Sequence, residues 1–493
     1  MKHKTVADAL SSSGVKNVAP FSNISMPFTL KPHQVQGLNL SLRKDRSGLF
    51  FDPRTGKTIV FTLAAIYCAH YGVKSIILMP PILFSQFHES WKELKGNPFS
   101  LYIFNQSKKR REALLKKWGE EGFPDCLTMT KELFKKHWRE LSEAGYRQLV
   151  FDESHLGLGK VSTGTYFSVS GFIQAPGGRL ILSTGTPIPT GIEGVYPSIK
   201  LINPGAYRDE DDFYRKHVEM TKITQKNRRG KEVLIDVPCG YKNLPLLHSN
   251  LYKNAVRARR FEVLSIDKPN IQTVPVELSS PHYTLYRRLM KERVLEVGDE
   301  VIPAVQASKL RMLALRLISS PQNYSDKPIA NQTLTALEQL LHSAGIDAGE
   351  KIAVFANFNE SVVTVTEKLK KYGARSVYGK NTASENARSV KAFQEDPECR
   401  VLVLNPQAGG VGLKLGHICT TVIFYEPVGS PGIFDQALSR VILEGQKKAV
   451  VCYILRVLDT ISPKAIGNML NKNHDIKQVN MDIQTLLDEL VLT

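Results

Sequence analysis

The chain has 493 residues, of which 65 are Lys or Arg and 47 are Asp or Glu, so its formal net charge is +18. This length exceeds what one hydrophobic core normally supports, and the apolar and charged fractions (42% and 23%) are ordinary for a folded protein. Composition therefore excludes a largely disordered chain and indicates two or more domains. The positive charge favours a polyanionic partner such as nucleic acid, although solubility alone is an alternative explanation.

The sequence carries no recognisable targeting, membrane or metal signal. Residues 1–17 lack the apolar segment of a signal peptide, and no run of about 18 apolar residues could span a bilayer. The six cysteines are scattered without a CxxC pair, so neither zinc nor a disulfide framework is indicated. We expect a soluble intracellular protein, cytoplasmic in a bacterial or virus-infected cell and nuclear if the source is eukaryotic.

Short apolar runs recur along the chain and predict parallel strands that are buried on both faces. In chain order these runs are 75–79, 148–152, 179–183, 351–356, 401–405 and 421–426. Helical patterns lie between them, for example over 58–72 and over 360–373, and the second ends at Gly373 because glycine commonly terminates helices. The alternation of strands and helices predicts a doubly wound α/β fold.

This alternation breaks between about Pro204 and Ala330, where charged, helix-leaning segments surround one strand-like piece at 271–278. We expect helical protrusions inserted between two α/β lobes. The predicted organisation is a first lobe over 1–205, protrusions and an inter-lobe linker over 206–330, and a second lobe over 331–493.

Residues 49–58 read LFFDPRTGKT, an apolar strand that leads into a turn and a helix beginning at Lys57. This is the context of a phosphate-binding loop. Its backbone N–H groups would cradle the phosphates, Lys57 would neutralise the β- and γ-phosphates, and the Thr58 hydroxyl would hold magnesium. The strict GxxxxGK[ST] pattern fails because Phe51 stands at the position of its first glycine. A coincidental helix start is the alternative interpretation.

Residues 150–155 read VFDESH, in which two acids follow a predicted strand. Asp152 would bind magnesium, and Glu153 would polarise the attacking water, as in-line phosphoryl transfer requires. Taken alone, this segment could be a capped helix start. Its occurrence about a hundred residues after a TGKT loop favours the catalytic interpretation.

These residues resemble those of the superfamily-two helicase ATPases, and within them the Swi/Snf-like branch of double-strand DNA translocases. The resemblance is ordered and extends from Leu30 to about Ser462. The segment 30–38 resembles the motif whose glutamine, here Gln34, reads adenine. The stretches 78–91, 128–134 and 182–191 are similar to later motifs of the first lobe, and 194–207 and 240–260 resemble stretches specific to this branch.

The resemblance implies two RecA-like lobes that bind ATP and Mg²⁺ between them. In the first lobe, Thr55, Gly56, Lys57 and Thr58 would contact the nucleotide, while His155, Thr184 and Thr186 would couple its site to the track. In the second lobe, the segments 351–361 and 377–393 continue the likeness. Segment 404–415 resembles a motif that brings glycines, here Gly412, close to ATP and to the nucleic-acid backbone. Segment 435–446 is similar to the closing motif, in which Gln436 and Arg440 match.

The chain departs from the family pattern at three positions. Arg54 stands where the family often has glycine, and Ser154 is a small change within the acidic motif. The third departure is Leu443, which replaces the second arginine of the closing motif. Such an arginine stabilises charge on the transferring phosphoryl group and is typically worth about 10³ to 10⁵ in rate. Arg440 is the first candidate for this role, with Lys447, Lys448 and Arg456 as weaker ones.

The basic runs 108–117 and 225–231 could contact phosphates or act as a nuclear signal, but a solvated helix face and a mobile loop are the favoured interpretations. Neither run is interleaved with the aromatic residues that stack on single-stranded bases. This favours tracking along the backbone of a duplex.

The sequence therefore predicts a monomeric, ATP-hydrolysing motor that moves on nucleic acid, with double-stranded DNA as the favoured track. A protein partner or its own protrusions would direct it to its place of action. The catalytic residues would be Lys57, Asp152, Glu153 and Arg440. A strand-unwinding DNA or RNA helicase is one alternative. A nucleic-acid-binding scaffold with impaired ATPase activity is another, and Leu443 is its main support.

Overall fold

The computed structural model describes residues 19–26, 28–188, 191–226, 232–297, 300–303, 307–407, 415–446 and 448–470. They form two compact units, one ending at Val263 and the other beginning at Leu264. Every helix that these residues form is too short or too polar to span a lipid bilayer.

The first unit is built on a seven-stranded sheet with the order β3-β4-β2-β5-β6-β1-β9. All neighbouring strands in this sheet are parallel. The strands are β1 (Arg46–Phe51), β2 (Lys74–Leu78), β3 (Leu101–Ile103), β4 (Cys126–Met129), β5 (Tyr146–Asp152), β6 (Arg179–Ser183) and β9 (Ala255–Ala258).

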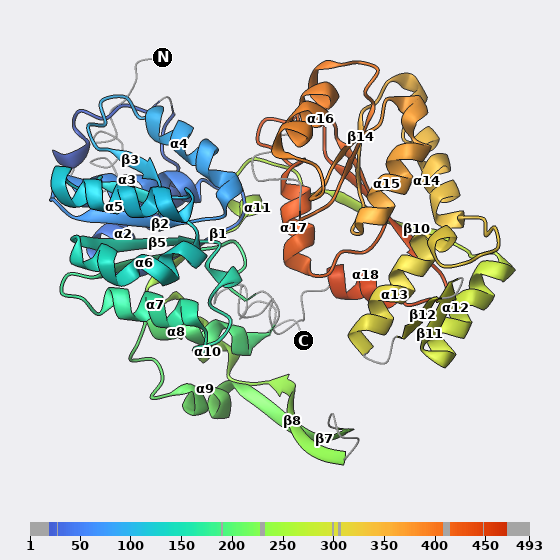
Figure 1. Cartoon of the computed structure of the whole chain (residues 1–493), viewed down its shortest axis with the longest axis horizontal. Helices are drawn as coiled ribbons and strands as arrows, with labels where there is room; N and C mark the ends of the chain where they lie inside the picture. Colours follow the sequence, from blue (N-terminus) through green and yellow to red (C-terminus); the bar gives the residue numbers. More distant parts are fainter. Residues whose placement is uncertain are drawn as a thin grey trace. The chain divides into compact units, whose positions relative to one another are not determined.

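Helices cover both faces of this sheet (Figure 1). The helices of this unit are α2 (Pro32–Arg43), α3 (Lys57–His70), α4 (Phe84–Lys92), α5 (Lys108–Glu121), α6 (Lys131–Glu143), α7 (Gly164–Ile173), α8 (Tyr196–Ile202), α9 (Glu210–His217), α10 (Leu244–Tyr252) and α11 (Arg260–Val263), of which α9 lies at the base of the hairpin described below. Leu149 and Phe151 of β5 pack into one apolar cluster and Val150 into another, because successive side chains of a strand point to opposite faces. This double burial explains why the strands are continuously apolar.

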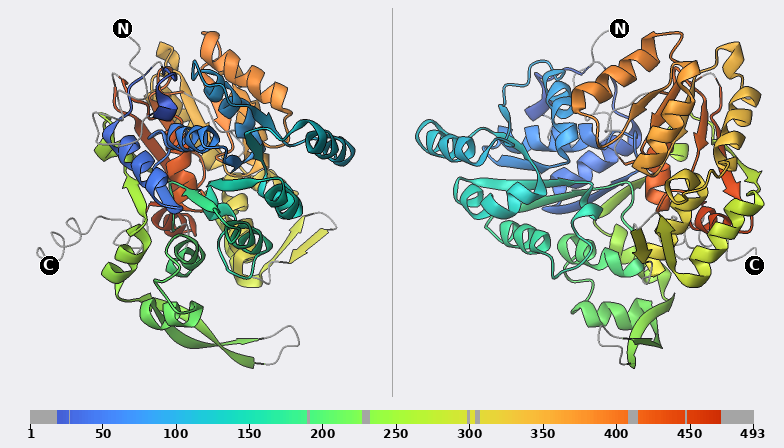
Figure 2. Two further views of the ribbon diagram at one scale, coloured as in Figure 1. Left: turned by 90° about the vertical axis from the view of Figure 1, so that its left-hand side faces the viewer. Right: turned by 45° about the vertical axis from the view of Figure 1, so that its right-hand side comes forward.

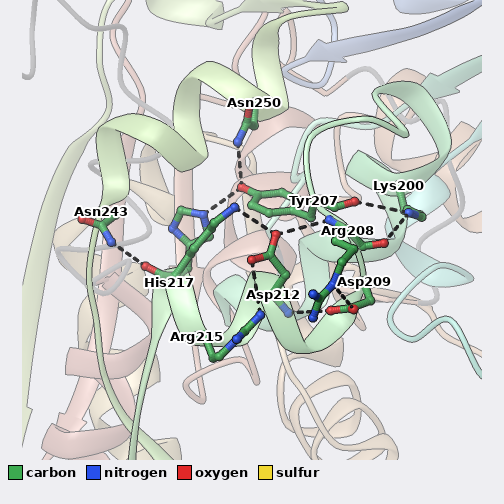
Figure 3. Close-up of polar contacts among 10 residues, drawn as sticks. Lys200, Tyr207, Arg208, Asp209, Asp212, Arg215, His217, Asn243 and Asn250 are labelled. Atoms are coloured by element: carbon green, nitrogen blue, oxygen red, sulfur yellow. Dashed lines mark hydrogen bonds and ion pairs between the residues drawn. The ribbon is translucent and has the colours of Figure 1, made fainter.

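A two-stranded antiparallel hairpin, β7 (Val218–Lys226) and β8 (Glu232–Tyr241), extends away from the first sheet (Figures 1 and 2). Its base is fixed by buried polar contacts (Figure 3). The ring of His217 lies 2.8 Å from the Tyr207 hydroxyl, which also accepts a hydrogen bond from Asn250 (3.1 Å). Burial lowers the pKa of His217, so this imidazole stays neutral near pH 7.

The second unit contains a six-stranded parallel sheet with the order β10-β17-β16-β13-β15-β14. Its strands are β10 (Asn270–Val276), β13 (Ile352–Phe355), β14 (Arg375–Val377), β15 (Val401–Leu404), β16 (Thr421–Phe424) and β17 (Val451–Val457). A small hairpin, β11 (Val294–Val297) and β12 (Glu300–Pro303), lies outside this sheet. The helices are α12 (Ser280–Glu292), α13 (Ala307–Ser319), α14 (Gln332–Ser343), α15 (Asn359–Lys368), α16 (Ala383–Glu395), α17 (Pro431–Ser439) and α18 (Ser462–Leu470).

The predicted fold class is confirmed, since both units are α/β and each has a parallel sheet. All the strands expected from apolar runs are present, and Gly373 has the left-handed conformation (φ 65°) expected where α15 and its following turn end. The basic run 108–117 lies on α5, where Lys108–Glu112 and Lys117–Glu121 ion pairs sit on an exposed face. Of the run 225–231, residues 227–231 lie outside the described residues.

The predicted inter-lobe region needs correction. Residues 206–330 do contain helices, among them α9, α10, α12 and α13, but they do not form a separate region. Ala255–Ala258 completes the first sheet, and the strand-like piece near 271 is β10 of the second sheet. The hairpin β7–β8 was also not predicted. The division between the units therefore falls at 263/264 rather than at 205 and 330.

Candidate nucleotide site

The loop between β1 and α3 has the form of a phosphate-binding loop. Gly56 precedes Lys57 with a left-handed φ of 87°, and a Cβ at this position would collide with the side-chain amide of Gln34. The loop closes on itself, because the Thr55 backbone N–H and hydroxyl both donate to the Asp52 carbonyl oxygen (3.3 and 2.8 Å). α3 begins directly after this tight turn, and the N–H groups in the first turn of a helix have no partners within the helix, which suits an anion.

Gln34 braces this loop from α2. Its Nε2 donates to the Thr55 carbonyl oxygen (3.1 Å), and the His33 ring contacts the same oxygen at 2.8 Å. The Oε1 atom of Gln34 accepts from the backbone N–H of Lys31 (2.8 Å), which fixes the orientation of the amide. The predicted adenine-reading residue is thus adjacent to the predicted phosphate loop.

Lys57 lies beside the acidic motif. Its Nζ is 3.6 Å from Glu153 Oε1, and the two side chains are only 10% and 21% exposed. Asp152 is buried and accepts a hydrogen bond from the Ser183 hydroxyl (2.7 Å). Burial raises the pKa of Asp152, and the charge of Lys57 opposes this rise. The two acids therefore lie in different surroundings, one buried and hydrogen-bonded, the other next to a lysine.

His155 connects the acidic motif to the predicted coupling segment. Its Nδ1 lies 3.4 Å from Glu153 Oε2 and 2.7 Å from the Thr184 hydroxyl. Thr184 Oγ1 in turn accepts from the backbone N–H of Thr186 (3.0 Å). Burial, reinforced by the charge of Lys57, lowers the pKa of His155 to about 4, so the ring is neutral and acts through hydrogen bonds.

The residues fit a magnesium ion that is bound together with a nucleotide, rather than a metal held by the protein alone. Within the described parts of the chain, no group of three or more His, Cys, Asp or Glu side chains could hold a metal by itself. Mg²⁺ bound with a nucleotide usually needs only one or two protein oxygens, because phosphates and water complete its shell. The Asp152 carboxylate and the hydroxyl of Thr58, which is exposed on the first turn of α3, are such donors.

In the second unit, the predicted closing motif packs against both flanks of the glycine-rich motif. Arg440 is buried, its Nη2 donates to the Pro406 carbonyl oxygen (2.8 Å), and its own carbonyl accepts from Leu415 N–H (2.9 Å). Gly412 lies outside the described residues. Gln436 lies on α17 and is half-buried.

The weaker candidates for the role of the missing second arginine lie in different surroundings from those of Arg440. Lys448 is 72% exposed and lies 3.6 Å from Glu350, Arg456 is exposed on β17, and Lys447 is outside the described residues. Leu443 is buried.

Three residues of the first unit were missed by the sequence reasoning. Asp52 and Ser183 stand at the carboxyl ends of β1 and β6, where parallel strands bring polar residues together, so their positions were a usable signal. Arg257 of β9 contacts the Asp52 carboxylate at 2.8 Å; it falls within the segment 240–260 that resembles the family, but that resemblance assigned it no role.

Known families match both units. Residues 44–193 match the family described as DEAD/DEAH box helicase, and residues 332–443 match the helicase conserved C-terminal domain. The human "DNA repair and recombination protein RAD54-like" is 24% identical over 441 residues, covering 81% of this chain and 57% of that protein. The bovine "DNA annealing helicase and endonuclease ZRANB3" is 24% identical and covers 68% of this chain and 30% of that protein. The chain thus spans little more than half of one relative and less of the other.

One solved structure also aligns along most of the chain. It is the Sulfolobus solfataricus SWI2/SNF2 ATPase core in complex with double-stranded DNA, with 17% identity, coverage of 94% of this chain and 97% of that one, and a TM-score of 0.41. Because this score is below 0.5, the fold assignment depends on the two parallel sheets described above.

Proposed function

We propose that this chain, which belongs to the superfamily-two helicase ATPases and within them to the Swi/Snf-like branch, hydrolyses ATP to move along double-stranded DNA. The observation that carries the proposal is the convergence of Lys57, Glu153 and His155 at the carboxyl edge of one sheet. Lys57 is about a hundred residues away in sequence from the segment that contains Glu153 and His155, and each of the three has chemistry that phosphoryl transfer requires.

Each candidate site residue of the first unit has a separate proposed role. The loop N–H groups and Lys57 bind the β- and γ-phosphates, and Gln34 recognises adenine. Thr58 and Asp152 would hold a magnesium ion, which would supply positive charge to neutralise the phosphates. Glu153 orients and polarises the attacking water, and the neutral His155 links this carboxylate to Thr184.

In the second unit, we propose that Gln436 and Arg440 support hydrolysis. Gly412 would allow the protein backbone to lie close to ATP and to the nucleic-acid backbone. The proposal for Arg440 is supported by its place in the closing motif beside Pro406 and Leu415, the flanks of the glycine-rich motif.

DNA is the proposed track because the net charge of +18 suits a phosphate polymer and because the relatives are named for DNA repair, recombination and annealing. We propose a monomeric motor that a protein partner directs to its place of action. Its location would be that of the DNA, in the cytoplasm of a bacterial or virus-infected cell or in a eukaryotic nucleus.

Phosphate release measured with duplex DNA, single-stranded DNA, RNA or no nucleic acid tests this function. Duplex DNA should stimulate release most, and the stimulation should fall steeply with salt. Lys57→Ala should lower release by about 10² or more, because the phosphates lose their lysine. Lys200→Ala is the control, since Lys200 Nζ donates to the backbone oxygens of Pro204, Tyr207 and Arg208, which lie outside the proposed nucleotide site.

Other outcomes would change the assignment. Equal stimulation by single strands or RNA favours the strand-unwinding helicase. Release that is at background in the wild type and unaltered by Lys57→Ala favours the scaffold with impaired ATPase activity, the candidate that Leu443 supports.

A further inference from the structure

Arg257 joins three parts of the first unit that are distant in sequence. It lies on β9, directly beside Phe50 in the register of β1. Its Nη1 donates to the carbonyl oxygens of Phe50 (2.7 Å) and Gly185 (3.2 Å), and its Nη2 contacts Asp52 Oδ1 (2.8 Å). The side chains of Arg257 and Asp52 are only 17% and 22% exposed, so solvent screens this ion pair little.

Asp52 is the first residue of the phosphate-binding loop and is held on several sides by the end of β9. Its second carboxylate oxygen accepts from the backbone N–H of Arg260 (3.0 Å), and its own N–H donates to the Ala258 carbonyl oxygen (2.9 Å). Since the Thr55 N–H and hydroxyl both bond to the Asp52 carbonyl, the position of Asp52 determines where the loop turns.

Gly185 connects the same arginine to the catalytic acid. It lies between Thr184 and Thr186 in residues 184–187, which read TGTP and are called the TGTP segment below. A Cβ at Gly185 would be 2.9 Å from Pro53 Cδ. Thr184 contacts His155, His155 contacts Glu153, and Glu153 contacts Lys57. The contacts therefore form a closed ring that runs from the loop through Arg257 and the TGTP segment and back to Lys57.

We propose that Arg257 is a positioning residue that fixes the phosphate-binding loop relative to the TGTP segment and so sets the geometry between Lys57 and Glu153. The proposal rests on the ATPase function proposed above. It requires an arginine, because one planar guanidinium reaches a carboxylate and two carbonyl oxygens at once, whereas a lysine ammonium is a single point that cannot span them.

The test compares Arg257→Lys and Arg257→Ala with the same changes at Arg179. Arg179 is a matched control in the same sheet, because it contacts one carboxylate (Asp45, 2.8 Å) and backbone oxygens such as that of Ser41 (2.8 Å). Its side chain is 21% exposed, close to the value for Arg257. It stands at the start of β6, whereas the nucleotide site is at the opposite end of that strand.

Both Arg257 variants should lose about 10- to 100-fold in kcat, because small misplacements of reacting groups are costly. The KM for ATP should change by less than about threefold, because the loop keeps its own turn and its N–H groups. The Arg179 variants should keep the wild-type kcat, even if they unfold at urea concentrations as low as those that unfold the Arg257 variants. Thr184→Ala combined with Arg257→Lys should lose less than the product of the two single effects, as expected for residues in one network.

The inference is overturned if Arg257→Lys keeps the wild-type kcat, or if the Arg179 variants lose as much. Should Arg257→Ala fail to fold, Arg257→Lys decides the question. A wild-type protein that releases no phosphate with any nucleic acid would instead contradict the proposed function, so the two failures are distinguishable.

Discussion

Arg54 has a backbone conformation that arginine rarely adopts. Its φ is 69°, the left-handed region, at the loop position where Swi/Snf-like ATPases often have glycine. The turn is therefore retained despite the departure in sequence, at a cost of about 1 to 2 kcal/mol for a residue with a Cβ. Burial, together with the nearby charge of Arg260, lowers the pKa of Arg54 to about 10.

Arg54→Gly should therefore stabilise the first unit, and it should exceed Arg54→Ala in stability by about 1 kcal/mol. The alanine variant removes the same charge but keeps the Cβ, so the difference isolates the backbone strain. Urea unfolding followed by tryptophan fluorescence measures it, because Trp91, Trp118 and Trp138 all lie in this unit. Equal stability of the two variants would show that the left-handed φ is not strained.

Leu443, the other prominent departure, belongs to the packing of the second unit. It is buried, and a Cβ at Gly416 would lie 2.8 Å from Leu443 Cγ. Its backbone N–H donates to Gln446 Oε1 (2.9 Å), whose amide in turn donates to the Gly416 carbonyl oxygen (2.6 Å). An arginine at this position would have to leave an apolar contact, so the missing charge is not restored by a simple exchange.

Lys57 and Glu153 were predicted from the TGKT and DESH motifs, and Thr184 was predicted from the family resemblance. The structure connects the three through His155 at one edge of the first sheet, where the parallel strands end. Arg257 was not predicted, since its contacts with Asp52 and Gly185 depend on β9 pairing with β1, and a strand of four residues at 255–258 has no periodicity that distinguishes it.

At the scale of elements, strand pairing between distant segments also explains why the predicted organisation of residues 206–330 was wrong. The segment 270–276 has strand composition, but nothing local reveals that it pairs with β17, which is far along the chain. The hairpin β7–β8 is exposed on much of its surface, for example at Lys222, Leu234 and Asp236. Its apolar residues are interspersed with charged and polar ones, so it lacks the longer apolar runs that predicted the buried strands.

Glu426 joins two elements of the second unit, because it follows β16 and holds the start of α15. Its Oε2 accepts from the backbone N–H groups of Asn357 (2.7 Å) and Phe358 (3.1 Å), and its Oε1 accepts from the Ser361 hydroxyl. Burial raises the pKa of Glu426 to about 7, although these donors oppose the rise. The folded protein thus binds a proton here more tightly than the unfolded chain does.

A raised carboxyl pKa gives stability that is complete below the unfolded value of 4.5 and is lost as pH rises through about 7. The second unit should therefore lose about 2 to 4 kcal/mol between pH 5 and pH 8 through this group. Glu426→Gln should abolish that loss, because the amide oxygen can still accept from both N–H groups. Circular dichroism during urea unfolding at the two pH values measures it, and Glu395→Gln, on an exposed part of α16, is the control. A pH dependence that persists in Glu426→Gln would contradict the assignment.

At the scale of the whole molecule, each unit has its own apolar core. Clusters on the two faces of the first sheet extend to Leu251 and Ala258, and the cluster of the second unit begins at Val276. Among the described residues, no apolar cluster includes members of both units. Each unit should therefore fold as an independent cooperative domain.

Fragments test the position of the boundary as well as this independence. Residues 1–263 and 264–493 should each show a cooperative urea transition. The fragment 1–205 should not, because it lacks Phe213, Leu247, Leu251 and Val256, which are buried in the cores of the first unit. Each such side chain contributes about 1.5 to 3 kcal/mol, and together they approach the total stability of a typical domain. A fragment 331–493 lacks Val276, Leu289 and Leu317 of the other core and should fail for the same reason. If 1–205 unfolds as cooperatively as 1–263, then α10 and β9 are an accessory to the lobe, and Arg257 would have no rigid strand from which to hold the phosphate-binding loop.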